Sequence, residues 1–254
     1  MILRYTFISG GNMIDKDKKM FLGIILMLFA FMIFVGVLAF RDKKEEIVNN
    51  TDALLFKTEY ESLNNVVREK DGKTIKELSI SLTNPVDILT EEETIQFLEN
   101  GTGLLYFGFA DCPWCRTLLP VLLSTLDNMS IGKLNYLNIS SIRDTLALDE
   151  KNKVEVKEEG TKGYYKILEL MDSVLKPFYL ETPDGKKIDT KEKRLYAPTL
   201  VGVKNGEIVG IHVGTIDSQE NGYDELTKEQ ESELANQLIE LINKVYDTSC
   251  DEAC

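Results

Sequence analysis

Two cysteines separated by two residues, Cys112 and Cys115, are the side chains best suited to chemistry in this chain. They follow an apolar, aromatic-rich run, residues 104–109, at the point where a strand pattern gives way to a helix. The thiolate is the nucleophile in disulfide exchange, and a helix N-terminus favours it through unpaired N–H groups and the positive end of the dipole. With Cys112 at the helix start, Cys115 can resolve a mixed disulfide formed at Cys112.

Pro113 supports this placement, because its missing N–H costs nothing in the first turn of a helix. Two other roles for the pair stay open: half of a zinc site, or an inert local disulfide. Zinc would need a second pair of Cys or His ligands, and the sequence contains one His, His212. The spacing predicts a redox-active Cys-Pro-Trp-Cys centre with Cys112 and Cys115 as catalytic residues, and it implies no metal and no organic cofactor.

The amino-acid composition argues against several classes of protein. The chain has 254 residues, of which 43% are hydrophobic, so it can bury one ordinary core. Its four cysteines form two close pairs, which would cross-link little of the unfolded chain and do not make a disulfide scaffold. The net charge of −13 argues against nucleic acid as a partner, because phosphate binding needs clustered Lys and Arg.

Residues 20–40, which begin with Met20 and end with Phe40, form an apolar run without a single charge. A run of about 20 apolar residues can cross a bilayer of roughly 30 Å as a helix. We therefore expect a single-pass membrane helix after an N-terminal flank, residues 1–19. The short flank favours a cytoplasmic N-terminus, which leaves the large domain extracytoplasmic at the cell membrane.

Two alternatives concern the same part of the chain. Val37-x-Ala39 is a tolerable signal-peptide cleavage site, and cleavage there would release a secreted domain. Met13 is an alternative start that would leave a compact charged flank ahead of the apolar run. The choice between Met1 and Met13 as the first residue does not change the expected function.

The remainder of the chain predicts one α/β domain. Residues 41–85 begin charged and polar, and we expect them to form a juxtamembrane linker and an N-terminal extension. Residues 86–246 alternate between strand and helix patterns. Within them, Thr90 and Glu93 form a capping box at the start of a helix that ends at Gly101.

Residues 140–196 have the polar pattern of an insertion in this domain. Two hairpins are predicted, with turns near 149–153 and 183–185, and a helix lies between them. An antiparallel strand pair with an Asn-Gly turn at 205–206 follows, and the last helix covers about 227–246.

Two stretches make the chain resemble proteins of the thioredoxin fold. One is Phe-Gly-Phe-Ala-Asp-Cys-Pro-Trp-Cys at 107–115, and the other is Tyr-Ala-Pro-Thr at 196–199. The resemblance covers roughly residues 87–246 and implies a central mixed sheet flanked by helices. In thioredoxin-like proteins the proline is cis and faces the cysteine pair, so the resemblance gives Pro198 this role and turns the Ala197 backbone toward a substrate chain.

Two roles are open for Trp114, which lies between the cysteines. An exposed indole would offer flat apolar surface to a peptide substrate, and with Ala197 and Pro198 it is a candidate substrate-binding residue. The alternative is that the indole packs at the helix end against Phe109.

The layout is most similar to membrane-anchored thioredoxin-like proteins of Gram-positive bacteria, including those of the bacteriocin transport accessory type. The chain departs from thioredoxin in its Pro-Trp dipeptide, its longer insertion, and Tyr106 at the strand position where thioredoxin has a buried acid. The group that takes the proton of Cys115 is therefore not implied by the resemblance. Asp111 is one substitute candidate, and a solvated turn residue is its other reading.

A second cysteine pair, Cys250 and Cys254, ends the chain in the tail 247–254. Four-residue spacing on a helix places both sulfurs on one face, within bridging distance after modest adjustment. Three roles stay open: a second redox pair that exchanges with the first, a local disulfide that seals the last helix, or a metal clip.

The resulting prediction is a membrane-anchored thiol–disulfide oxidoreductase of a bacterial cell. Its partners would be extracytoplasmic protein thiols or disulfides, together with an electron-donor or exporter protein. The alternative is a non-catalytic accessory or chaperone subunit of an exporter, in which the insertion carries the partner contacts and the cysteines contribute little.

Overall fold

The computed structural model describes residues 27, 28, 32, 51–69 and 71–246. The chain divides into two units, Met1–Thr51 and Asp52–Cys254, and nearly all described residues belong to the second. Most of the predicted membrane run 20–40, with its flank and the C-terminal tail, lies outside the described residues. Within the described ranges, no helix is both long enough and apolar enough to span a bilayer.

A five-stranded mixed sheet, in the order β1-β3-β2-β8-β9, forms the centre of the second unit. β2 runs parallel to β3, which runs parallel to β1, whereas β8 is antiparallel to both β2 and β9. Every residue of β2 is buried, which explains its unbroken apolar pattern. The bounds are β1 Val86–Ile88, β2 Gly103–Gly108, β3 Leu134–Asn138, β8 Thr199–Lys204 and β9 Glu207–Val213. The predicted mixed α/β class, a mixed sheet flanked by helices, is confirmed.

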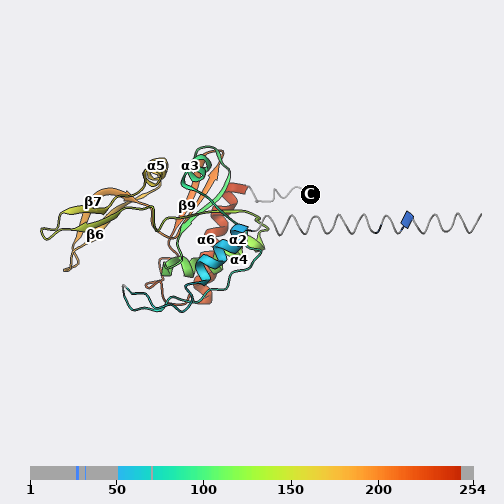
Figure 1. Cartoon of the computed structure of the whole chain (residues 1–254), viewed down its shortest axis with the longest axis horizontal. Helices are drawn as coiled ribbons and strands as arrows, with labels where there is room; N and C mark the ends of the chain where they lie inside the picture. Colours follow the sequence, from blue (N-terminus) through green and yellow to red (C-terminus); the bar gives the residue numbers. More distant parts are fainter. Residues whose placement is uncertain (1–26, 29–31, 33–50, 70, 247–254) are drawn as a thin grey trace, which may run out of the picture. The chain divides into compact units, whose positions relative to one another are not determined.

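Helices cover both faces of the sheet (Figure 1). On one face, α6 packs closely on β8, since a Cβ added at Gly202 would lie 2.7 Å from a methyl group of Val245. α4 packs beside α6, and α2 lies on the same face, while α3 and α5 pack together on the other (Figure 1). The bounds are α2 Thr51–Glu61, α3 Glu91–Asn100, α4 Pro113–Asn128, α5 Lys162–Leu170 and α6 Lys228–Tyr246.

Several helix and strand boundaries lie where the local sequence predicts them. The Thr90 hydroxyl accepts from the backbone N–H of Glu93, and the Glu93 carboxylate accepts from the backbone N–H of Thr90, which completes the predicted capping box of α3. Asn205 and Gly206 both have positive φ, 53° and 79°, as a two-residue turn between β8 and β9 requires.

The region 140–196 contains both predicted hairpins as separate two-stranded sheets, β4–β5 and β6–β7, with α5 between them. The Arg143 guanidinium contacts the loop between β2 and α4, since it lies 4.7 Å from the centre of the Phe109 ring. Within the region, Arg194 forms an ion pair with Asp144. The strand bounds are β4 Thr145–Leu148, β5 Val154–Glu158, β6 Lys176–Glu181 and β7 Lys187–Arg194.

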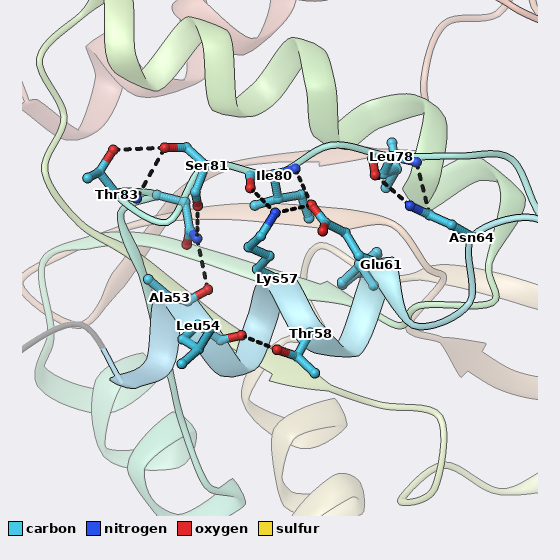
Figure 2. A network of polar contacts seen from close by, with 12 residues as sticks. Ala53, Leu54, Lys57, Thr58, Glu61, Asn64, Leu78, Ile80, Ser81 and Thr83 are labelled. Atoms are coloured by element: carbon cyan, nitrogen blue, oxygen red, sulfur yellow. Dashed lines mark hydrogen bonds and ion pairs between the residues drawn. The ribbon is translucent and has the colours of Figure 1, made fainter.

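The structure differs from the sequence expectation in the segment 41–85. Part of the expected linker, Thr51–Glu61, is the helix α2, which buries three side chains in the main core: Ala53, Phe56 and Tyr60. The chain after α2 then runs back along it, as Figure 2 shows. The Glu61 carboxylate accepts from the backbone N–H of Ile80 at 2.6 Å, and Lys57 Nζ donates to the Ile80 carbonyl at 2.7 Å. These contacts make residues 51–69 and 71–85 part of the domain rather than a tether, whereas residues 41–50 lie outside the described residues.

We expect Phe56→Ala to destabilise the domain by about 3–5 kcal/mol, because the buried ring contacts Tyr60 and Tyr136 at centroid distances of 4.8 Å. Leu55→Ala is the matched control, since Leu55 is 52% exposed on the same helix and should change stability by less than about 0.5 kcal/mol. Urea unfolding of the purified chain measures both. Equal effects would mean that α2 is not part of the core.

Candidate functional site

Cys112 is the N-cap residue of α4. Its backbone is extended, Pro113 occupies the first helical position, and the Cys112 sulfur accepts a hydrogen bond from the backbone N–H of Cys115 at 3.2 Å. A side-chain acceptor at this position satisfies one of the N–H groups that a helix start leaves without a partner. The helix therefore supplies its N-terminal N–H groups to one of the two predicted redox sulfurs.

The pKa values of the two thiols are shifted in opposite directions. Burial acts to raise the pKa of Cys112, but hydrogen bonds from the Cys115 thiol and from the backbone N–H groups of Cys115 and Trp114 outweigh it, so the pKa is lowered. Burial raises the pKa of Cys115 far above its usual value, and its hydrogen bond to Cys112 adds to the increase. Cys112 is thus the more acidic thiol of the pair, and Cys115, buried behind it, is the less acidic one.

The Ala197–Pro198 peptide bond is cis, as the sequence resemblance implied. The Cys112 thiol donates to the Ala197 carbonyl at 3.4 Å, although 85 residues separate the two in sequence. Pro198 is buried, and its carbonyl accepts from the backbone N–H of Gly214 at 2.9 Å. This loop therefore faces the cysteine pair with the Ala197 backbone nearest the Cys112 sulfur.

A hollow of about 380 Å³ lies beside this contact. Trp114 and Ala197 both line it, whereas Pro198 does not. The other lining residues come from the loop before β8, from the end of β9 and from the segment after β9: Tyr196, Val213, Gly214, Thr215, Ile216, Asp217 and Gln219. The hollow is large enough for a side chain of a substrate that approaches the Cys112 sulfur along the Ala197 backbone.

Trp114 packs against Gly222 and not only against its own helix. A Cβ at Gly222 would lie 2.9 Å from the indole, so no larger residue fits there without movement. The Gly222 carbonyl also accepts from the Thr117 hydroxyl of α4 at 3.1 Å. One side of the indole is thereby held, while another part of it lines the hollow.

Arg116, next in sequence to Cys115, is 1% exposed, and sequence reasoning did not single it out. Its guanidinium donates to the carbonyl oxygens of Lys76, Tyr60 and Ala110 at 2.5, 2.9 and 2.8 Å. It also donates to the side-chain oxygen of Asn64. These contacts tie the cysteine helix to α2, to the chain after α2 and to the loop that precedes Cys112.

The contacts of Asp111 fit its other role considered from the sequence, that of a turn residue. Its negative charge acts to raise the pKa of Cys112, which opposes the thiolate. Its backbone carbonyl accepts from Arg68 Nη1 at 3.1 Å, which fits a turn residue. Tyr106, from the buried strand β2, lies next to the Cys115 thiol.

Cys250 and Cys254 lie outside the described residues. Within the ranges that the structure describes, no group of three or more His, Cys, Asp or Glu side chains could hold a metal ion. In that same part of the chain, Cys112 and Cys115 are free thiols.

We expect iodoacetamide to modify Cys112 first at neutral pH. A pKa difference of one unit changes the thiolate fraction about tenfold, so Cys112 should react at least about ten times faster than Cys115 at pH 7. Alkylation rates at each cysteine, followed by peptide mass mapping between pH 5 and 9, measure this difference. Comparable rates at both positions throughout that range would remove the distinction between the two thiols.

No family model matches the chain, and no curated protein matches it significantly. The geometry of the cysteine pair and the Ala197 loop is therefore the basis on which a function can be assigned.

Proposed function

We propose that the chain is a thioredoxin-like thiol–disulfide oxidoreductase that acts on protein substrates. The contact that carries the proposal joins the Cys112 sulfur at the start of α4 to the Ala197 carbonyl beside a cis proline. It places one thiol of lowered pKa against the partly buried backbone of Ala197, with a second thiol buried three residues further on. That combination suits a reaction in which a sulfur on a peptide approaches Cys112.

In the proposed reaction the Cys112 thiolate attacks one sulfur of a substrate disulfide. The substrate S–S bond breaks, one substrate thiolate leaves, and a mixed disulfide joins Cys112 to the other substrate sulfur. Cys115 then loses its proton and attacks the Cys112 sulfur, which releases the second substrate thiolate and leaves a Cys112–Cys115 disulfide. Two electrons pass from the dithiol to the substrate, and the same steps run in reverse when the substrate is oxidised.

Substrate recognition would use the backbone of Ala197 and the hollow beside it. An extended peptide can hydrogen-bond to an exposed backbone segment and place alternate side chains in a pocket. Trp114 and Tyr196 provide aromatic surface at the hollow. Both residues are partly exposed, so they can contact a substrate without rearrangement of the core.

The charge-free run 20–40 supports a further part of the proposal, an anchor in the cell membrane that leaves this domain extracytoplasmic. Disulfides form and persist outside the reducing cytosol, so that location agrees with the proposed chemistry. A purely accessory role beside an exporter makes a different prediction: a Cys112→Ser, Cys115→Ser double variant would then keep its cellular function.

Equilibration against a series of glutathione redox buffers tests the reaction. We expect one reversible two-electron transition, in which about 30 mV corresponds to a tenfold change in the equilibrium constant, and the midpoint gives the preferred direction of electron flow. Cys112→Ser should abolish the transition, whereas Cys115→Ser should accumulate a mixed disulfide between Cys112 and glutathione, visible by intact mass.

The control is the same series on a Cys250→Ser, Cys254→Ser variant, which separates the site from the second cysteine pair. An unchanged midpoint in this variant would assign the transition to Cys112 and Cys115. A pair that stays reduced, or stays oxidised, across the whole series would contradict the proposed function.

A further inference from the structure

Cys115 must lose a proton before it can attack a mixed disulfide, yet its side chain is completely buried. Burial and the hydrogen bond to Cys112 hold its pKa well above the usual value, so the proton is bound tightly at neutral pH. The proposed reaction therefore needs a group near Cys115 that can take the proton and a route by which it reaches solvent.

Three tyrosine hydroxyls connect Cys115 to a carboxylate. The Tyr106 hydroxyl lies next to the Cys115 thiol and 3.3 Å from the Tyr60 hydroxyl. The Tyr60 hydroxyl interacts in turn with that of Tyr136, which donates to Glu59 Oε1 at 2.7 Å. All three tyrosines are completely buried, whereas Glu59 is only partly buried.

The strand sequence fixes the position of the first hydroxyl. Tyr106 and Gly108 point to the same face of β2, and a Cβ added at Gly108 would lie 2.4 Å from the Tyr106 hydroxyl oxygen. The missing side chain at Gly108 therefore leaves the space that this hydroxyl occupies. The Tyr106 and Tyr136 rings also stack, with centroids 5.5 Å apart and an interplanar angle of 22°.

The carboxylate sets the direction of the hydrogen bonds. A hydroxyl has one proton to donate, and Tyr136 donates its proton to Glu59. The 3.3 Å contact between Tyr60 and Tyr106 allows either hydroxyl to donate. A proton can travel from Cys115 to Glu59 when Tyr136 accepts from Tyr60 and Tyr60 from Tyr106, which leaves a lone pair of Tyr106 for the S–H of Cys115. Each hydroxyl in this arrangement points away from the thiol and toward Glu59.

Glu59 is suited to the far end of such a chain. Desolvation raises the pKa of its carboxyl group, although hydrogen bonds from Tyr136 and Asn138 act to lower it. Asn138 Nδ2 donates to Glu59 Oε1 at 2.7 Å and so helps to hold the oxygen that Tyr136 contacts. Because the residue is not fully buried, a proton that reaches it can pass to water.

We propose that Tyr106, Tyr60, Tyr136 and Glu59 form a proton relay that serves Cys115 during the second step of disulfide exchange. The inference rests on the proposed function. As the Cys115–Cys112 bond forms and the Cys112–substrate bond breaks, the S–H proton moves to the Tyr106 oxygen. Tyr106 passes its own proton to Tyr60, Tyr60 to Tyr136 and Tyr136 to Glu59, which releases it to water.

The test uses the reduced full-length chain with Cys250→Ser and Cys254→Ser, and the chromogenic disulfide 5,5′-dithiobis(2-nitrobenzoate). Attack by Cys112 releases the first thionitrobenzoate, and resolution by Cys115 releases the second. We expect Tyr106→Phe and Glu59→Gln each to slow the second release at least about tenfold while the first is unchanged, because proton transfer by positioned groups typically contributes that much or more. The protein–thionitrobenzoate adduct should then accumulate and be visible by intact mass.

Tyr164→Phe is the matched control, because the Tyr164 hydroxyl is buried without a hydrogen-bond partner and lies outside the relay. It should leave both releases unchanged. Glu59→Gln keeps the shape of a partly exposed side chain, so it tests the relay even if Tyr106→Phe fails to fold. A second release that is as fast in Glu59→Gln as in the parent would overturn the relay alone. Absence of the first release from the parent would instead overturn the proposed function.

Discussion

One buried guanidinium, that of Arg116, joins the segments that surround the cysteine pair. A buried cation is tolerated only when its donors are satisfied, and Arg116 meets this condition with acceptors from α2, from the chain after α2 and from the loop before Cys112. Displacement of any one segment would leave part of the charge without a partner. Arg116 also donates to the backbone carbonyl of Tyr60. The position of the Tyr60 side chain behind Cys115 therefore depends on Arg116, the next residue after Cys115.

The cysteine site shows which parts of the structure can be predicted from the sequence alone. Apolar runs, a capping box, an Asn-Gly turn and the Cys-Pro-Trp-Cys spacing are local signals, and each predicted its element because the physics that produces it acts over a few residues. α2 was mistaken for a linker because its buried stripe is narrow. Ala53, Phe56 and Tyr60 face the core, but Leu54 and Leu55 are about half exposed and blur the pattern.

The groups around Cys115 could not be predicted in this way, because their partners are distant in sequence. Tyr60 and Tyr106 are 46 residues apart, and Glu59 and Tyr136 are 77 apart, so only the register of β2 beside β3 and the position of α2 bring them together. The contacts of Arg116 were equally hard to predict, since its acceptors from Tyr60, Lys76 and Ala110 are backbone carbonyl groups, which any residue type could supply. The sequence did offer one signal, a tyrosine at the strand position where a thioredoxin-like protein would have an acid.

The location of Glu59 separates the path of protons from the path of substrate. Residues of α4, of the Ala197 loop and of the segment after β9 line the hollow beside Cys112, and none of its lining residues belongs to α2. A polypeptide bound over Cys112 would cover that face and exclude water from the sulfur it has just engaged. In the proposed relay, the outlet at Glu59 on α2 would stay open under those conditions, so the exchange could be completed while the partner is still in place.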